Sequence, residues 1–366
     1  MSVPEARSER PLEGKPAGQS LPPVEAPTAT FILQLFLIPL LIVSIVVLLW
    51  LGFSWMAQVG RDNPQDLVQA LRRGDGSSWQ RAYELADLLR SPDPKYDALR
   101  RDKALAGELA AMLEQDLDIP VKGERDKVRV MRRMFLCRAL GAFEVTAGLP
   151  VLMRAAKEER DPIEVEVRLA ALEAITTLAS NCGPELFAAN EPLMALLLDC
   201  SREVDDSGPS PTTAVGQPNA YRPHAEIRAV AAYALGVIGG DRATERLRVM
   251  LGDSYANARY NAATGLARHG DAACIGVLKE MLDPDNNQAA RDENNARDKD
   301  RKRATVLING VRAALDYAAA NPGADLTVLN AALQSLAESP LTQLQSDKGN
   351  IQSAAVEALR LIENRK

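Results

Sequence analysis

The longest apolar run of the chain lies close to its N-terminus, at residues 31–53. It contains no charged side chain, and Gln34 is its only strongly polar residue. As an α-helix the run would rise about 35 Å, which exceeds the hydrocarbon thickness of a bilayer, about 30 Å. Trp50 and Trp55 lie near its end, where indole rings favour the membrane interface. We therefore predict a transmembrane helix at residues 31–53.

Two other interpretations of this run are a cleaved signal peptide and a buried core helix. The run is long for a signal peptide, and Trp55-Met56-Ala57 is a poor cleavage site. Its length and uniformly apolar composition argue against a buried core helix. Residues 1–30 hold few large apolar side chains and many prolines, so we predict a disordered tail there. The prolines are Pro4, Pro11, Pro16, Pro22, Pro23 and Pro27.

Basic residues are distributed unequally on the two sides of the run. The twenty residues before it hold Lys15, whereas the twenty after it hold Arg61, Arg72 and Arg73. Cytoplasmic flanks of membrane helices carry the excess of Lys and Arg. By a margin of two charges, this rule places the C-terminal part in the cytoplasm.

From Asn63 onward, apolar residues recur at helical spacing between breaks of Gly, Pro and Asp. The stretch 227–240 is a clear example, because its apolar residues fall at three- and four-residue steps and make one stripe. Gly239 and Gly240 follow as a C-terminal stop. The stripe consists of Ile227, Val230, Ala231, Ala234, Leu235 and Ile238.

The same helical segment recurs along the chain. Residues 228–235, which begin Arg-Ala-Val-Ala-Ala, align with segments that mostly begin with arginine and continue with small and apolar residues. These segments are Arg133–Leu140, Arg168–Ile175, Arg259–Leu266, Ala354–Leu359 without the arginine, and less closely Arg301–Ile308. Repetition of one unit predicts a stacked array rather than separate globular domains.

A second pattern precedes these helices. Gly240-Asp241 leads to a short apolar-striped segment, and Gly270-Asp271 leads to a similar one 30 residues later. Each unit is therefore helix, short turn, helix. One such pair cannot hide its apolar surface alone, and stacking on its neighbours does so.

These features resemble the HEAT-like repeat family in its short bacterial form. The matching residues are the Gly-Asp before the first helix, Asp-Pro in the turn, and a Val-Arg or Ile-Arg pair that opens the second helix. They are Asp161-Pro162, Asp283-Pro284, Val167-Arg168 and Ile227-Arg228. The resemblance covers residues 225–285 and 126–200, and less closely 62–110 and 300–366. It implies an all-α fold, an α-solenoid over residues 62–366 with a concave face that binds a protein partner.

Two segments depart from the repeat. Residues 201–221 form an insertion rich in Pro, Ser, Gly and Thr, which is either a functional loop or a surface excursion. Residues 292–303 run from acidic to basic, as a solvated helix start or as a docking patch.

Composition excludes several functions. The chain has 43 basic and 49 acidic residues, a formal charge of −6, and no basic stretch of the kind that nucleic acids require. Four scattered cysteines, with no CxxC pair, predict small buried residues rather than a disulfide framework. Two histidines, His224 and His269, form no set with these cysteines that has standard zinc-ligand spacing, which excludes a standard zinc site. The cysteines are Cys137, Cys182, Cys200 and Cys274.

The sequence predicts no catalytic, cofactor-binding or metal-binding residues. Neither histidine adjoins a nucleophile, and the phosphate-loop, dinucleotide and zinc-protease motifs do not occur. Asp205-Asp206 lacks the spaced oxygen ligands of a calcium loop. We interpret the repeated arginines as structural, paired with turn aspartates across stacked units. They are Arg133, Arg168, Arg228 and Arg259.

Together these features predict a membrane-anchored, non-catalytic scaffold that binds an unidentified protein through the solenoid. The expected location is the bacterial inner membrane, with the solenoid in the cytoplasm; the sequence does not set the oligomeric state. Two other functions stay open. Similar repeats occur in bilin lyases, so a lyase-like or chaperone-like action on a partner protein is one, and a purely structural envelope role is the other.

Overall fold

The computed structural model describes residues 29–59, 64–73, 78–202, 223–291, 293, 295–342, 344–345 and 347–364. The chain divides into two units, residues 1–62 and 63–366. Regular structure in the described ranges is helical throughout, which confirms the all-α prediction. The predicted tail up to residue 28, and residues 203–221 of the predicted insertion, lie outside the described residues.

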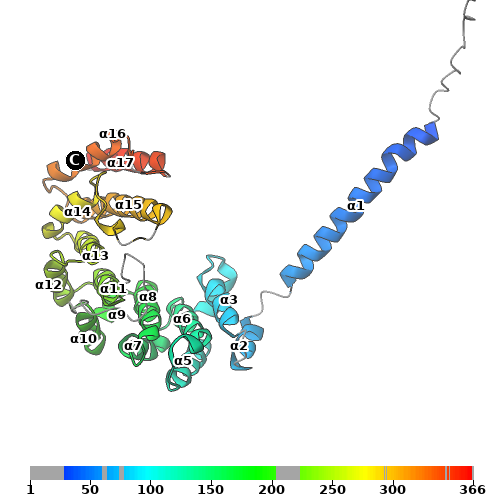
Figure 1. The fold of residues 1–366 in the computed structure, drawn as a ribbon, viewed down its shortest axis with the longest axis horizontal. Coiled ribbons are helices and arrows are strands. Elements are labelled where there is room, and N and C mark those ends of the chain that lie inside the picture. The colour runs from blue at the N-terminus through cyan, green and yellow to red at the C-terminus, as the bar shows by residue number, and fades with distance from the viewer. Residues whose placement is uncertain are drawn as a thin grey trace, which may run out of the picture. The chain divides into compact units, whose positions relative to one another are not determined.

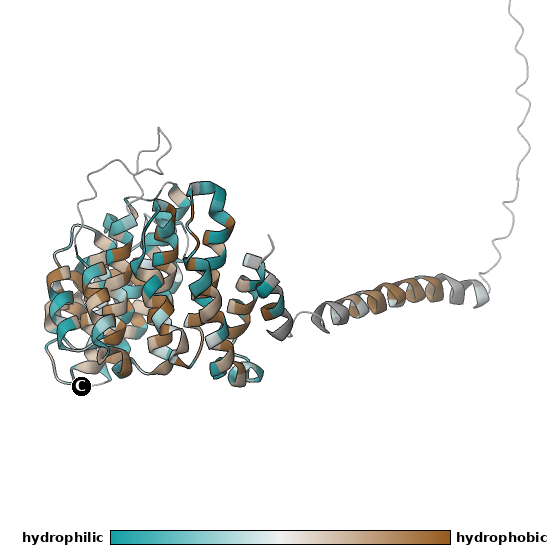
Figure 2. Ribbon diagram, turned by 90° about the horizontal axis from the view of Figure 1, so that it is seen from below, coloured by the Kyte–Doolittle hydropathy of each residue, from teal (hydrophilic) through white to brown (hydrophobic). Residues whose placement is uncertain are grey.

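The first unit contains one long helix, α1 (Ala29–Val59), which includes the whole predicted span. Its segment Phe36–Ser54 has 19 residues, a mean hydropathy of 2.8 and no burial within the protein. In Figure 2 the coloured part of this helix is mainly hydrophobic. By length and composition the segment is suited to cross a membrane.

The second unit consists of helical pairs that follow one another along the chain (Figure 1). Within each pair the two helices pack side by side. The pairs are α2 (Pro64–Arg73) with α3 (Ser78–Arg90), α5 (Lys103–Leu117) with α6 (Lys127–Gly141), α7 (Leu149–Lys157) with α8 (Val165–Cys182), α10 (Glu191–Cys200) with α11 (Pro223–Ile238), α12 (Asp241–Met250) with α13 (Ala256–Arg268), α14 (Ile275–Met281) with α15 (Ala296–Ala320), and α16 (Thr327–Glu338) with α17 (Lys348–Glu363).

Short elements fill the connections between these helices. Two are α-helical, α4 (Asp97–Arg100) and α9 (Pro184–Ala188). The 3-10 turns among the described residues are Pro94–Tyr96, Gly123–Asp126, Thr146–Gly148, Pro162–Glu164, Ala272–Cys274 and Gln288–Ala290.

The pairs stack mainly through their second helices, which we call the second layer. In this layer α3 packs on α6, α6 on α8, α8 on α11, α11 on α13, α13 on α15 and α15 on α17. The first helices form a first layer beside it, with α5 against α7, α7 against α10, α10 against α12, and α14 against α16. This arrangement is the α-solenoid of helix pairs that the repeat predicts.

Local sequence explains where these helices begin and end. The Asp102 carboxylate accepts hydrogen bonds from the backbone N–H groups at the start of α5, and Asn190 caps α10 in the same way. In α11 the predicted apolar stripe is buried apart from the half-buried Val230. Gly239 and Gly240 then adopt left-handed φ angles of 74° and 91°, which end the helix as predicted.

Close helix crossings in the second layer depend on missing side chains. A Cβ atom on Gly236 of α11 would lie 2.6 Å from the Cα atom of Gly265 in α13. A Cβ atom on Gly141 of α6 would lie 2.7 Å from the Cα atom of Ala174 in α8. Because these contacts involve backbone, the helices would have to move apart to accept even a methyl group.

We expect Gly236→Ala to destabilise the array by about 1–3 kcal/mol, because overpacked sites force backbone shifts. Gly107→Ala in α5 is the matched control: nothing lies within 4 Å of its added Cβ atom, so higher helix propensity should stabilise by up to about 1 kcal/mol. Urea denaturation of the full chain in detergent, followed by circular dichroism, measures both. Equal midpoints for the two variants would contradict the close crossing.

Candidate functional site

Arg133 on α6 is completely buried and joins two successive pairs. Its Nε lies 3.4 Å from Asp116 Oδ1 at the end of α5, and its Nη1 donates to Glu164 Oε1 at 3.0 Å in the next pair's turn. Nη2 donates to the carbonyl of Ile119 at 2.5 Å. A buried guanidinium that is hydrogen-bonded to these acceptors has a structural role.

The other repeated arginines are also paired. Arg228 makes a bidentate, buried pair with Asp253 in the following turn, at 3.0 and 3.2 Å. Arg259 donates to Glu280 Oε1 at 2.8 Å, and Arg168 pairs with Glu159. The predicted pairing with a turn aspartate is thus found for Arg228, whereas Arg259 and Arg168 pair with glutamates. Because these arginines are already paired with carboxylates, they do not form an anion-binding site.

A second set of polar contacts links the ends of the second-layer helices. His269 Nε2 lies 3.0 Å from the carbonyl oxygen of Gly236, one pair earlier. Asn321 donates to the carbonyl of Gly270 at 3.0 Å, and Asn181 donates to that of Gly141 at 3.3 Å. These side chains satisfy carbonyls at the ends of the preceding helices, which otherwise lack partners. His269 is therefore a capping residue. Asn181 and Asn321 cap helix ends in the same way, and no sequence motif predicts this role for them.

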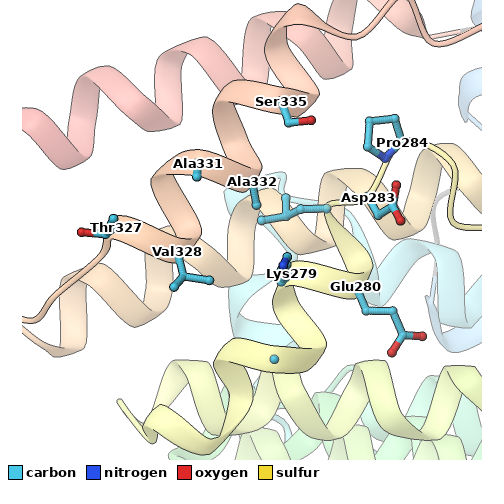
Figure 3. A pocket seen from close by; sticks show the side chains of 11 residues that line it. Lys279, Glu280, Asp283, Pro284, Thr327, Val328, Ala331, Ala332 and Ser335 are labelled. Atoms are coloured by element: carbon cyan, nitrogen blue, oxygen red, sulfur yellow. The ribbon is translucent and has the colours of Figure 1, made fainter.

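An open groove of about 690 Å³ lies between α14 and α16 of the first layer (Figure 3). Leu282 forms part of it and is buried, whereas Val328 on the other wall is 49% exposed. Small side chains keep the groove open. The lining consists of Gly276, Lys279, Glu280, Leu282, Asp283, Pro284, Thr327, Val328, Ala331, Ala332 and Ser335.

The polar groups of this groove differ in their availability. The Glu280 carboxylate accepts hydrogen bonds from Arg259 and, at 2.7 Å, from the Tyr260 hydroxyl, so it is already occupied. Burial raises the pKa of Tyr260 above its usual range, which keeps the phenol a donor. Lys279 is exposed and extends beside the apolar wall (Figure 3). The groove thus suits a ligand that inserts an apolar side chain and offers a hydrogen-bond acceptor to Lys279.

A second candidate surface lies on α3 and α6. Trp79 stacks on Phe135 with ring centroids 6.1 Å apart, and Tyr83 meets Phe135 edge-on at 5.2 Å. The guanidinium of Arg138 lies 5.3 Å from the centroid of Phe135. These four side chains come from two different pairs and remain at least partly exposed.

Comparison with known protein families gives one match. Residues 219–294 match the family model of HEAT repeats. The match contains residues 225–285, where the resemblance was predicted to be clear, and it covers α11 to α14. No curated protein matches the chain.

The remaining candidate residues belong to the helical pairs or to the turns between them. Cys137, Cys200 and Cys274 are buried and Cys182 partly so. Burial raises the pKa of the Cys137 and Cys274 thiols to about 12, which leaves them protonated and unreactive. His224 Nε2 lies 3.8 Å from a carboxylate oxygen of Glu159. Among the described residues, no group of three or more His, Cys, Asp or Glu side chains is arranged to hold a metal.

The two departures from the repeat differ in outcome. In the acidic-to-basic segment 292–303, residues 296–303 begin α15, and Asn295 caps that helix by accepting from the backbone N–H of Asp298. This agrees with a solvated helix start. Asp205-Asp206 lies in the predicted insertion, outside the described residues.

Replacing Arg133 should uncouple neighbouring helical pairs. We expect Arg133→Met to destabilise the array by about 3–5 kcal/mol, because it leaves Asp116 and Glu164 buried without their shared cation. Arg360→Met, which removes an exposed pair with Glu357, should have little effect. The measurement is again urea denaturation of the full chain. Equally small losses in both variants would show that Arg133 does not join the pairs.

Proposed function

We propose that this chain is a membrane-anchored, non-catalytic scaffold whose HEAT pairs bind a partner protein. The observation that carries the proposal is the combination of an apolar helix long enough to cross a bilayer with a helical-pair array that has an accessible apolar groove. HEAT repeats generally mediate interactions between proteins, and residues 219–294 match them. The groove residues Gly276 to Pro284 come from this matched part, and Thr327 to Ser335 from the pair that follows.

The anchor in this proposal is α1. The positive-inside rule, with Lys15 before the span and Arg61, Arg72 and Arg73 after it, supports a cytoplasmic position for the array. The likeness to short bacterial repeats supports the bacterial inner membrane.

The bilin-lyase-like alternative requires an aromatic-lined groove that would hold a pigment. The groove between α14 and α16 is lined by aliphatic, small and charged side chains, which does not favour that chemistry. We therefore favour a protein, rather than a pigment, as the ligand of this groove.

Deletion of residues 31–53 should move the protein from the membrane fraction to the supernatant, because it removes the apolar segment that favours the bilayer. The intact chain should stay in the membrane after an alkaline wash that releases peripheral proteins. Protease added outside spheroplasts should spare the C-terminal part. Release of the intact chain by the alkaline wash would contradict membrane anchoring.

A photo-cross-linking amino acid at Val328 tests partner binding in the groove. In native membranes we expect a discrete cross-linked protein from Val328 and none from Val249, an equally apolar residue that is 64% exposed on α12. Filling the groove with Ser335→Trp should abolish the product. Identical products from both positions, or none from Val328, would contradict a specific partner in this groove. Turnover of a small molecule by the purified chain would contradict the non-catalytic role.

A further inference from the structure

The aromatic side chains of the second unit are mostly buried, which makes the exposed ones informative. Phe143, Phe187, Tyr260 and Tyr317 each lie in the core. In contrast, Tyr83 is 51% exposed, and it adjoins the partly exposed Trp79 and Phe135. We call the exposed surface of Trp79, Tyr83, Val128, Phe135 and Arg138 the aromatic face.

The members of the aromatic face fall on one side of each of its two helices. Trp79 and Tyr83 are four residues apart on α3, and they therefore lie on the same side of that helix. Val128, Phe135 and Arg138 follow at steps of seven and three on α6, which again brings them to one side. Trp, Tyr and Arg, which this face contains, are the residue types enriched among those that dominate binding energy at protein interfaces.

The charge around this face is positive and incompletely balanced. Helix α6 contains Lys127, Arg129, Arg132, Arg133 and Arg138 and no acidic residue. Asp116 is shared by three of these arginines, at 3.7 Å from Arg129, 3.1 Å from Arg132 and 3.4 Å from Arg133. Glu164 pairs with Arg133 and also with Arg160, and Lys127 lies 3.5 Å from Glu124. Three arginines thus share one aspartate, and Arg138 has no ion pair with a described carboxylate.

One guanidinium group beside the rings is directly available to a ligand. Arg138 is partly exposed and rests on the Phe135 ring, and no described carboxylate lies within ion-pair distance of it. Arg132, by contrast, is held by Asp116 and by the carbonyl of Leu71. The neighbouring helix α3 does not cancel the charge of Arg138, because its Arg81–Glu84 pair is neutral and Asp87 is matched by Arg90. An apolar patch beside an uncompensated arginine is complementary to an acidic, apolar-anchored ligand.

From this combination we infer that the aromatic face docks an acidic segment of a partner protein, which inserts a bulky apolar side chain against Trp79 and Tyr83 and places a carboxylate on Arg138. The inference rests on the proposed scaffold function and specifies the chemistry of a partner. It concerns α3 and α6, whereas the groove lies on α14 and α16, so the two can be tested separately.

Trp79 provides a direct readout of the aromatic face. The chain has three tryptophans, and the other two, Trp50 and Trp55, belong to the apolar helix. In the full chain with Trp50→Phe and Trp55→Phe, kept in detergent, Trp79 is the sole source of tryptophan emission. The probe is a synthetic glutamate-rich peptide with leucines at three- and four-residue spacing.

We expect this peptide to change Trp79 emission saturably, and the effect to weaken with added salt because charges are screened. The same peptide with lysine in place of glutamate should cause no change. Arg138→Glu and Tyr83→Ser should each weaken binding by about tenfold or more. Tyr233→Ser is the matched control, because this tyrosine is 43% exposed on α11 and should be dispensable. Circular dichroism shows whether each variant remains folded.

Several results would overturn the inference. They are no emission change with the glutamate peptide, an equal change with the lysine peptide, or equal losses from Tyr83→Ser and Tyr233→Ser. A change in Trp79 emission that depends on protein concentration alone would assign the face to a second copy of this chain. If Val328 still cross-links its partner in any of these cases, the scaffold proposal stands and only the acidic-segment inference fails.

Discussion

The structure depends on one constraint: a helical pair of this kind cannot bury its apolar surface without a neighbour. The second layer meets this constraint by bringing α11 and α13 together at Gly236 and Gly265, where no side chain keeps the backbones apart. Arg133 adds a directional tie, since its two carboxylates come from its own pair and from the next. Apolar contact supplies most of the stabilisation, while the buried arginines favour a single stacking register, a role that buried polar groups are known to play.

The same constraint determines where binding surfaces remain. Side chains that face the neighbouring pair are used for stacking, and the arginines and capping residues His269 and Asn321 are used for its edges. What is left is the outward side of each layer. There, the groove between α14 and α16 and the aromatic face of α3 and α6 retain apolar atoms that stacking does not cover. Repeat proteins bind through such surfaces because the stack itself is rigid and extended.

Much of the fold could be predicted from the sequence because its determinants are local. The apolar stripe of α11, the glycine stop after it and the arginine repeated in α6, α8, α11 and α13 all fall at short, regular spacings. The candidate surfaces could not be predicted in this way. Trp79 and Phe135 belong to different pairs, and the groove combines Lys279 with Val328 across a helix–helix contact. Their proximity depends on how closely successive pairs stack, which no local pattern specifies.

The net charge of the sequence likewise does not predict the charge of an individual surface. The whole sequence is mildly acidic, at −6, and this argues against a general basic surface of the kind that nucleic acids require. It does not describe α6, where five cations gather around few carboxylates. Stacking contributes to this imbalance, because it draws Asp116 and Glu164 inward to hold Arg133, while Arg138 on the Phe135 ring has no ion pair with a described carboxylate. The ion pairs that join successive helical pairs thus use the carboxylates that could otherwise balance the charge on α6, and a partner that binds Arg138 would be recognising a consequence of the stacking itself.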